Sequence, residues 1–433
     1  MKRIYGVFCG AVILFSVIAI SIGCASLRAV NNRALSPEYM FAWDFLDVFF
    51  LFRDNIPRDP FAFASPVELY ESVNEPFTNY YTPNQASRIL NSLGTSSAGL
   101  GVRLDSVQSG YALREVFPNT PAEKAGLKKG DTLTSINGKK TAGLSARKVS
   151  QLLSGKRGEQ KELEIARAND EHFAITVAID EFLAPSVFSD SLTPQIAYIF
   201  ISSFFTQTAV PGGTAAEFKN ALQETAWADQ TILDLRDNPG GEIGQAVQVV
   251  SEFLEPQTPI VKATERTLNP NTAQGITVDT TWVSLENHSS AVNRTFFVLM
   301  NQATASASEF LIASFNAHRS DIISIGSRSY GKARGQAVVL TPDSGLSVVT
   351  FALITPIDGP SYDMTGIEPN IKIGSREDAL DKALEIAESR LTKASLDSRS
   401  ENNKVSLLRY MYSLQNRKPM AIREFNANGI FLQ

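Results

Sequence analysis

Few side chains in this chain of 433 residues can supply imidazole or thiol chemistry. It has three histidines, His172, His288 and His318, and two cysteines, Cys9 and Cys24. Two cysteines do not make a disulfide framework or a zinc site built from cysteines alone, because these use four or more cysteines. A mechanism that needs imidazole can therefore draw on these three histidines alone.

A serine-containing turn at residues 301–309 offers candidate nucleophiles. It follows the apolar segment 296–300, which is typical of a buried strand, and it opens an apolar helix. Ser306 therefore lies at a strand-to-helix turn, where the helix N-terminus favours developing negative charge. Ser308 is an alternative nucleophile. We expect Glu309 to be a carboxylate at the helix start rather than an acid catalyst.

A serine hydroxyl needs a base to become a nucleophile. His318 lies 12 residues along the same helix, roughly 18 Å away at 1.5 Å per residue, and cannot reach Ser306. His288 is not excluded by spacing alone. A lysine can act as the base when burial lowers its pKa toward neutrality. Lys332 follows Gly331, whose unusual backbone freedom can turn the lysine inward, although a lysine by itself is more often a surface residue.

Strand and helix patterns alternate from residue 183 to about residue 390. A helix is expected at 246–254, and apolar runs typical of buried strands lie at 196–201, 231–236 and 296–300. The second of these runs ends in Asp-Asn-Pro-Gly-Gly at 237–241. This alternation predicts strands covered by helices, with functional sites at the carboxyl ends of the strands.

Residues 97–182 show a different pattern, in which short strands are separated by turns. GLGV at 99–102 leads into a strand, and NTPAEKAGLKKGDTLTSING at 119–138 contains a short helix closed by glycine and an Asn-Gly turn. A helix is expected at about 145–154, with strands at 161–167 and 172–180. This combination resembles a PDZ domain.

The PDZ resemblance implies a way of binding peptides. Backbone N–H groups of the loop would hold a terminal carboxylate, and the following strand edge would pair with an extended peptide. The loop residues are Gly99, Leu100, Gly101 and Val102. A PDZ fold that only packs, without a ligand, is the alternative.

Further motifs occur in one order along the chain. They are EPFTNYY at 75–81, LDLRDNPGG at 233–241, NQATASASEFL at 301–311, SYGK at 329–332 and TPIDGPSYDMTGIEPN at 355–370. With the inserted PDZ-like segment, they resemble the C-terminal processing peptidases, the tail-specific serine proteases of family S41. The resemblance covers roughly residues 70–370. It implies a mixed α/β fold: a ClpP/crotonase-like catalytic core, an inserted small β-rich PDZ domain and an N-terminal helical segment.

The resemblance also implies the roles of individual residues. The family's Ser–Lys dyad falls on Ser306 and Lys332, and Gln336 matches the glutamine that orients the lysine. The oxyanion hole would be built from backbone N–H groups of Gly240 or Gly241, and of Ala307. No metal and no organic cofactor is implied.

Two features depart from the family pattern. The interval of 26 residues between Ser306 and Lys332 is one longer than usual, which implies a small insertion near 316–320. Some members carry an acidic residue in the middle of the helix that follows the serine. Positions 316–318 here are Asn, Ala and His, so the role of that residue is not carried over.

The first residues are predicted to form an export signal. Lys2 and Arg3 precede a nearly continuous apolar run, Ile4–Ile22. The following Gly-Cys resembles a lipoprotein signal in which Cys24 is lipidated, although Ser21 stands where an aliphatic residue is usual. An ordinary cleaved signal is one alternative. An uncleaved anchor is another, because 19 residues span roughly 28 Å at 1.5 Å each.

Composition limits the remaining possibilities. The formal net charge of −5 gives no basic excess, which argues against nucleic acid as a partner. Hydrophobic residues make up 43% and charged residues 20%, so the chain can form a packed core and is not disordered. A stripe at helical spacing, expected to face a core rather than a membrane, comprises Phe41, Phe45, Phe49 and Phe52.

Together these patterns predict an organisation and a function. The segments are a lipoprotein-type signal peptide at 1–23, an N-terminal helical segment at 24–96, a PDZ domain at 97–182, an S41 catalytic domain at 183–390 and a tail of unknown role at 391–433. The predicted protein is an exported, lipid-anchored serine endopeptidase of a bacterial envelope, facing the periplasm or the cell exterior. It would cleave polypeptides with apolar C-termini, and a homo-oligomer or an activating partner stays open. The alternative is a non-catalytic PDZ-bearing peptide-binding scaffold.

Overall fold

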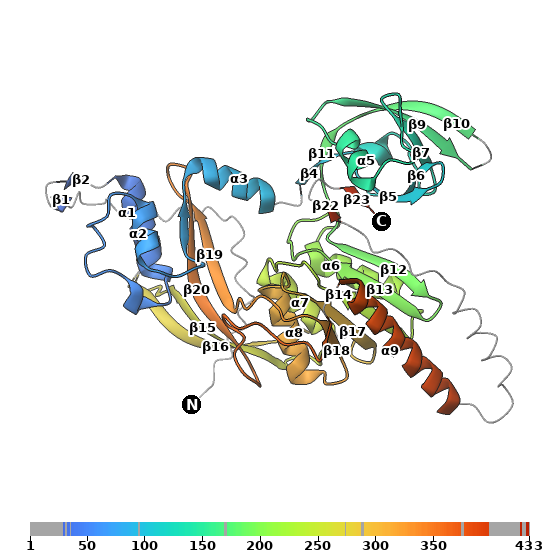
Figure 1. Ribbon diagram of the computed structural model, residues 1–433. Helices are drawn as coiled ribbons and strands as arrows, with labels where there is room; N and C mark the ends of the chain where they lie inside the picture. Colours follow the sequence, from blue (N-terminus) through green and yellow to red (C-terminus); the bar gives the residue numbers. More distant parts are fainter. Residues whose placement is uncertain are drawn as a thin grey trace.

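The computed structural model describes residues 29–30, 33–34, 36–93, 96–168, 171–272, 274–286, 290–373, 376–397, 425–426 and 430–432. Within this part of the chain lie sheets of eight, six and five strands, with helices packed around them (Figure 1). The predicted signal peptide at 1–23, Cys24 and most of the predicted tail at 391–433 lie outside the described residues. A short pair, β1 (Ala29–Val30) and β2 (Arg33–Ala34), precedes the first helix.

The six-stranded sheet is the centre of the mixed α/β fold that the sequence predicts. Its order is β12-β13-β14-β17-β18-β21. β12 is antiparallel to β13, and the other neighbours are parallel. The inner strands read as nearly continuous apolar runs because both faces of the sheet are buried. The strands are β12 (Val187–Thr193), β13 (Ile196–Ile201), β14 (Gln230–Asp234), β17 (Thr295–Met300), β18 (Ile323–Gly326) and β21 (Ile371–Lys372).

Helices cover both faces of this sheet. Alternate residues of β17 point to opposite sides: Phe296 and Val298 join the core shared with α6, α7 and α8, whereas Phe297 and Leu299 pack with α9. In Figure 1, α7 and α8 lie side by side and α9 lies apart from them. The helices are α6 (Gly213–Glu224), α7 (Ile243–Ser251), α8 (Ala307–His318) and α9 (Arg376–Asp397).

A five-stranded sheet joins the N-terminal helices to the rest of the fold. Its order is β16-β15-β20-β19, and β3 (Asn79–Tyr81) adds to β20. The main strands are β15 (Pro259–Leu268), β16 (Gly275–Val283), β19 (Arg334–Leu340) and β20 (Leu346–Pro356). The helices are α1 (Pro37–Phe49), a 3₁₀ turn (Arg53–Asn55), α2 (Pro66–Ser72) and α3 (Pro83–Leu93). The first and second of these α-helices share a core with Val349 of β20, so the N-terminal segment is packed onto this sheet.

The aromatic stripe predicted on α1 is offset by one residue from the buried face. The core-facing residues are Tyr39, Ala42, Leu46 and Phe50. The predicted stripe, Phe41, Phe45, Phe49 and Phe52, is half-buried, and Phe45, Phe49 and Phe52 pack around that core. The prediction that this stripe faces a core is therefore confirmed for three of its four residues, although the most tightly packed positions, such as Ala42, lie one residue further along the helix.

The eight-stranded sheet contains strands of the unit predicted to be a PDZ domain, 97–182, together with β22 and β23 from the predicted tail, and two helices accompany it. Its strand order is β10-β9-β7-β6-β5-β23-β22, with β8 paired to β7. The helices are α4 (Pro121–Lys124) and α5 (Ala146–Leu153). The strands are β5 (Val102–Val107), β6 (Gly110–Val116), β7 (Thr132–Ile136), β8 (Lys139–Lys140), β9 (Gln160–Arg167), β10 (Glu171–Ala178), β22 (Phe425–Asn426) and β23 (Ile430–Leu432).

The segments that lead into and out of this unit lie side by side. β4 (Ser96–Gly99) and β11 (Asp180–Leu183) form an antiparallel pair, with Gly99 opposite Asp180. The unit is thus an insertion between the N-terminal helices and the central sheet. In the described part of the chain, no helix has both the length and the apolar character needed to cross a membrane.

Candidate active site

Ser306 lies at the turn between β17 and α8, as its place in the sequence predicts. It is the N-cap of α8, with φ of 55° and ψ of −114°. A positive φ is uncommon for a residue other than glycine and is typical of strained turns at functional sites. Hydrogen bonds fix the turn to the loop after β14: Thr304 Oγ1 donates to Leu235 O at 2.8 Å, and Asp237 N donates to Asn301 Oδ1 at 3.0 Å.

The two serines of this turn lie in different surroundings. Ser306 is half-buried, whereas Ser308 is completely buried. The Ser308 hydroxyl donates to the carbonyl of Asn238 at 3.3 Å. This contact supports the loop that follows β14, so the geometry favours Ser306 over Ser308 as the nucleophile.

The Asp-Asn-Pro-Gly-Gly loop packs directly against Ser306. Gly240 has φ of +99°, and a Cβ on it would lie 2.7 Å from Ser306 Cβ and 2.8 Å from Ala307 N. Only glycine permits this approach and this backbone angle. The Gly240 N–H donates to Asn238 Oδ1 at 2.9 Å and is therefore already bonded within the loop.

Gly241 and Ala307 present the remaining backbone donors. Phe204 pairs with the loop through Gly240 O and Glu242 N, so the Gly241 N–H points to the opposite side. Ala307 is the first residue of α8, and the first N–H groups of a helix have no partner within it. Neither N–H donates to another residue in the described part of the chain. Of the three residues predicted to form an oxyanion hole, Gly241 and Ala307 thus have a backbone N–H without an acceptor among the described residues, whereas Gly240 does not.

Glu309 connects the Ser306 turn to the loop that carries Lys332. Its side chain is fully buried in the first turn of α8. Oε2 accepts from Ser306 N at 2.9 Å and from Lys332 N at 2.8 Å. Oε1 accepts from Ser329 Oγ at 2.5 Å and from Gly331 N at 2.6 Å. One carboxylate therefore holds the backbones of the predicted nucleophile and the predicted base.

Lys332 is half-buried on the loop between β18 and β19, and among the described residues its Nζ bonds to a glutamine rather than to the Ser306 hydroxyl. Burial lowers the pKa of its ammonium group, against the opposing attraction of the Glu75 and Glu309 carboxylates. Its Nζ donates to Gln336 Oε1 at 2.5 Å. Gln336 lies on β19, where a bulge between Gly335 and Gln336 interrupts the pairing with β20. The predicted pair of lysine and orienting glutamine is thus in contact.

A buried ion pair directly precedes the glycine loop in the chain. Asp234 ends β14, and Arg236 Nη2 lies 2.6 Å from its Oδ2, with both side chains almost fully buried. Tyr198 OH donates to the same oxygen at 2.6 Å. Burial disfavours the guanidinium charge, but the Asp234 carboxylate outweighs it and raises the pKa of Arg236. Sequence inspection placed these residues in a motif without predicting that they pair.

Neither of the two histidines that the structure describes, His172 and His318, forms a hydrogen bond with Ser306. His318 ends α8, and its Nε2 lies 2.7 Å from Pro259 O. His172 is exposed on β10 of the inserted unit. His288 lies outside the described residues. The described part of the chain also has no group of three or more histidine, cysteine, aspartate or glutamate residues placed to hold a metal ion.

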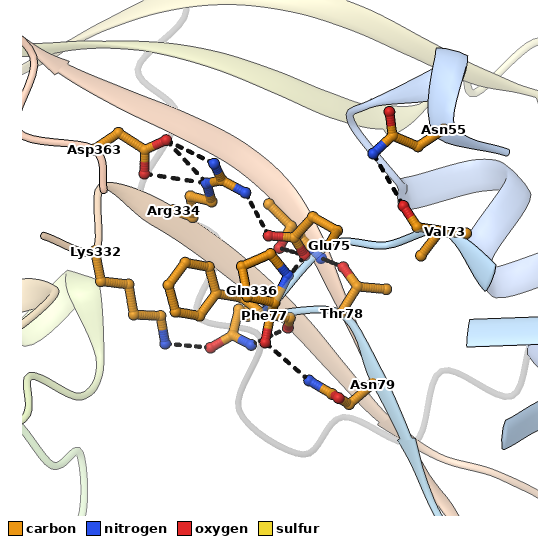
Figure 2. A network of polar contacts seen from close by, with 12 residues as sticks. Asn55, Val73, Glu75, Phe77, Thr78, Asn79, Lys332, Arg334, Gln336 and Asp363 are labelled. Atoms are coloured by element: carbon orange, nitrogen blue, oxygen red, sulfur yellow. Dashed lines mark hydrogen bonds and ion pairs between the residues drawn. The ribbon is translucent and has the colours of Figure 1, made fainter. Parts of the chain in front are cut away.

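A second set of polar contacts surrounds Gln336 and was not predicted (Figure 2). Phe77 O accepts from Gln336 Nε2 at 2.5 Å. Arg334 Nη1 donates to Glu75 Oε1 at 2.6 Å, and its Nη2 donates to Asp363 Oδ2 at 2.8 Å. In the sequence, EPFTNYY at 75–81 is recognisable only as a motif. Its one charged residue, Glu75, in an otherwise uncharged and partly aromatic segment, is the signal that could have suggested a structural partner.

The predicted peptide-binding loop of the inserted unit lies between β4 and β5. Leu100 and Val102 are buried in the core of the unit, and Gly101 has φ of +79° with its Cα packed against Thr120. The carbonyls of Leu100 and Gly101 accept from Ala122 N and Phe117 N, each at 2.9 Å. β5 pairs with β6 on one side. Its other edge pairs in parallel with β23, where Phe431 lies opposite Arg103. This edge thus accepts an extended segment.

The chain matches two known families. Residues 195–373 match peptidase family S41, and residues 114–167 match the PDZ domain. The carboxy-terminal processing protease CtpA of Bacillus subtilis (strain 168) is 27% identical over 306 residues, which cover 70% of this chain and 62% of that protein. The carboxyl-terminal-processing protease of Synechocystis sp. is 28% identical over 297 residues, covering 67% and 66%. The chain spans about three fifths of the length of the Bacillus subtilis relatives CtpA and CtpB.

A solved structure shares the fold. The putative S41 protease from Bacteroides fragilis NCTC 9343 superposes with a TM-score of 0.51 at 17% sequence identity, covering 81% of this chain and 97% of that one. At this identity the likeness concerns the fold alone. It agrees with the mixed α/β core and the inserted β-rich unit predicted from the sequence.

Proposed function

Because the chain carries a peptidase family S41 domain and a PDZ domain, we propose that it is a serine endopeptidase that cleaves proteins selected by their C-terminal tails. Ser306 is the nucleophile, and Lys332 is the general base. The observation that carries the proposal is the environment of Lys332. Its ammonium group is partly withdrawn from water, bonded to a neutral amide, and carried on a loop that shares the Glu309 carboxylate with the Ser306 turn.

The first chemical step is attack on a peptide carbonyl. Neutral Lys332 takes the proton of the Ser306 hydroxyl as Oγ forms a bond to the carbonyl carbon. The carbonyl oxygen becomes an oxyanion, which accepts hydrogen bonds from Gly241 N–H and Ala307 N–H. Both groups are backbone donors fixed before substrate binds, so they need little reorganisation in the transition state.

Cleavage and hydrolysis complete the cycle. The tetrahedral intermediate expels the amine as the C–N bond breaks, and protonated Lys332 gives its proton to that amine. This leaves an acyl group on Ser306. A water molecule then attacks the ester carbonyl, Lys332 accepts a proton from this water, and the return of that proton to Ser306 Oγ releases the new carboxyl end.

The PDZ unit selects the substrate in this proposal. A peptide adds to the edge of β5 as an extended strand, and its terminal carboxylate is held by N–H groups of residues Gly99 to Val102. Pairing of β23 with the same edge supports this mode of binding. An apolar C-terminal side chain would lie between β5 and α5, because β23 contacts both of these elements in the structure.

Export and a lipid anchor are part of the proposal and rest on the sequence pattern. Ile4–Ile22 precedes Gly-Cys, and acyl chains attached at Cys24 would hold the protein at a membrane surface. The intact mass of detergent-extracted protein tests this. An N-terminus at Cys24 with added acyl mass supports the anchor, and an unmodified Met1 contradicts it.

Hydrolysis of casein by the purified chain separates the protease from the scaffold alternative. The wild-type chain should cleave casein, and Ser306→Ala should not. Ser308→Ala is the matched control: it loses one buried hydrogen bond, costing about 1 kcal/mol of stability, but should still cleave. A wild-type chain that binds peptides and leaves casein intact would favour the scaffold.

A further inference from the structure

A segment far from Lys332 in the sequence contacts the glutamine that binds this proposed base. Residues 75–78 lie between α2 and β3 in the N-terminal part of the chain, and Phe77 lies 259 positions before Gln336. Figure 2 shows Phe77 between Lys332 and the ion pairs of Arg334. The packing of α1, α2 and β3 against β20 brings this segment to the strand beside Gln336.

The backbone of Phe77 determines which way the Gln336 amide faces. A side-chain amide has one accepting oxygen and one donating nitrogen. The Phe77 carbonyl can only accept, and it receives Nε2 of Gln336 at 2.5 Å. The accepting Oε1 must then face the other way, where it receives Lys332 Nζ at 2.5 Å. With the amide turned around, its NH₂ group would face the lysine and offer it no acceptor.

This orientation matters for a neutral amine. Neutral lysine has two N–H bonds and one lone pair, and rotation about Cε–Nζ can point that lone pair in any direction. A hydrogen bond from Nζ to Gln336 Oε1 restricts the rotation. The lone pair is thereby confined to directions other than that of the glutamine, which favours proton transfer from a fixed serine hydroxyl.

The ring of Phe77 covers the lysine. Lys332 Nζ lies 5.2 Å from the ring centroid, and Arg334 Cζ lies 5.6 Å from the same centroid. The ring has two opposing effects on the ammonium ion. It excludes water, which disfavours the charge, and its electron-rich face attracts a cation. The two effects can be separated by substitution, because a leucine excludes water but has no aromatic face.

Charged groups surround this arrangement and hold it in place. Glu75 Oε1 pairs with Arg334 Nη1 at 2.6 Å, and its Oε2 accepts from Thr350 Oγ1 at 2.7 Å and from Phe77 N at 3.2 Å. Asp363 neutralises the other side of Arg334. The charged groups that act on Lys332 are thus Glu75 from this segment and Glu309 from α8, with Arg334 beside it on the same ring.

We propose that Phe77 is a positioning residue of the proposed protease: its carbonyl orients the Gln336 amide and its ring shields Lys332, so the N-terminal segment is part of the catalytic apparatus. Glu75, tied to Arg334 and Thr350, fixes Phe77 in that position. The inference rests on the proposed function, in which Lys332 is the base. It adds that the base is assembled only when residues 75–78 are docked on β19 and β20.

The test compares Phe77→Ala with Phe77→Leu in the whole chain. Neutral Lys332 is the active form, so kcat/KM rises with pH as the lysine loses its proton. Phe77→Ala admits water to Nζ and should move this acidic limb to higher pH. Phe77→Leu keeps the apolar cover and loses only the attraction of the ring for the cation, so the limb should stay in place or move to lower pH. At neutral pH, Phe77→Ala should lose up to about 10²-fold in kcat/KM if the lysine shifts by about 1 Å.

Phe63→Ala is the matched control. Phe63 is another half-buried phenylalanine of the N-terminal segment. It packs on the core that α1 and α2 share. Its loss should reduce stability without moving the acidic limb. An acidic limb of Phe77→Ala at the wild-type position, or one that moves equally in Phe77→Ala and Phe77→Leu, overturns the proposal.

Competitive acetylation of Lys332, followed by mass spectrometry across pH, separates this inference from the proposed function. The method reads the protonation of Lys332 in the folded chain whether or not the chain cleaves peptides. Lys332 of Phe77→Ala should become reactive at higher pH than Lys332 of the wild-type chain. If the wild-type chain shows no hydrolysis but this shift occurs, the proposed function fails while the positioning by Phe77 stands. If hydrolysis occurs and the shift does not, the positioning fails alone.

Discussion

Replacing Glu309 by glutamine removes one acceptor oxygen from the centre of the site. In the wild-type chain, Oε2 serves Ser306 N and Lys332 N, while Oε1 serves Ser329 Oγ and Gly331 N. An amide keeps one acceptor and adds two donors. Whichever way it turns, its NH₂ group faces groups that now donate to the carboxylate.

The less costly orientation can be worked out from these contacts. With the amide oxygen on the Oε2 side, the bonds from Ser306 N and Lys332 N are kept. The NH₂ group then faces Ser329, whose hydroxyl can rotate to accept, and the Gly331 N–H, which cannot. One hydrogen bond to a charged group is lost, worth about 1.5–3 kcal/mol, and the retained bonds are weakened because the charge is gone. We expect a total loss of about 2–5 kcal/mol in this fully buried position.

Thermal unfolding and peptide hydrolysis measure this loss. For a domain of 150–250 residues, 1 kcal/mol lowers the midpoint by about 2–4 °C, so Glu309→Gln should lower that of the catalytic domain by at least about 4 °C. Hydrolysis should fall as well, because the bonds kept to Ser306 N and Lys332 N are weaker without the charge and Gly331 N loses its acceptor. Glu385→Gln, at an exposed position of α9, is the control and should change stability by less than about 0.5 kcal/mol. A Glu309→Gln chain with wild-type midpoint and turnover would refute the role given to this carboxylate.

Three further outcomes follow from the geometry. Gly240→Ala should reduce kcat/KM, because its Cβ would lie 2.7 Å from Ser306 Cβ, whereas Gly143→Ala, also at positive φ but in open space, should not. In fluorescence anisotropy titrations, peptides with a free apolar C-terminus should bind about 10- to 150-fold more tightly than their amides, the loss expected for charge-assisted hydrogen bonds of about 1.5–3 kcal/mol; equal affinities would contradict carboxylate recognition. Deletion of residues 425–433 should strengthen peptide binding, because β23 pairs with the edge of β5 that the peptide would use; unchanged affinity would place the peptide elsewhere.

Local patterns in the sequence predict much of the fold and part of the site. The strand at 295–300 and the following helix were predictable because an apolar run and a serine turn with a capping glutamate are local signals. The inserted unit was predictable for the same reason, since its turns contain glycine and asparagine at fixed places. Family S41 and PDZ matches agree with both.

Contacts between distant segments were not predictable in this way. Nothing near Phe77 in the sequence indicates that its carbonyl meets Gln336, because the contact depends on how α1 and α2 pack against β20. Glu309 was expected at the start of a helix, where it lies, but its bond to Lys332 N depends on a loop 23 positions later. The most deeply buried positions of α1 lie one residue beyond the predicted aromatic stripe, because aromatic residues on neighbouring faces obscure the periodicity.

Turnover of casein by Lys332→Ala is the most direct test of the proposed dyad. Ser306→Ala and Lys332→Ala should each abolish turnover. The double variant should be no worse than either single variant, because members of one catalytic unit act non-additively. His318→Ala should stay active, since that histidine lies at the far end of α8. Wild-type turnover by Lys332→Ala would contradict the assignment of the lysine as the base.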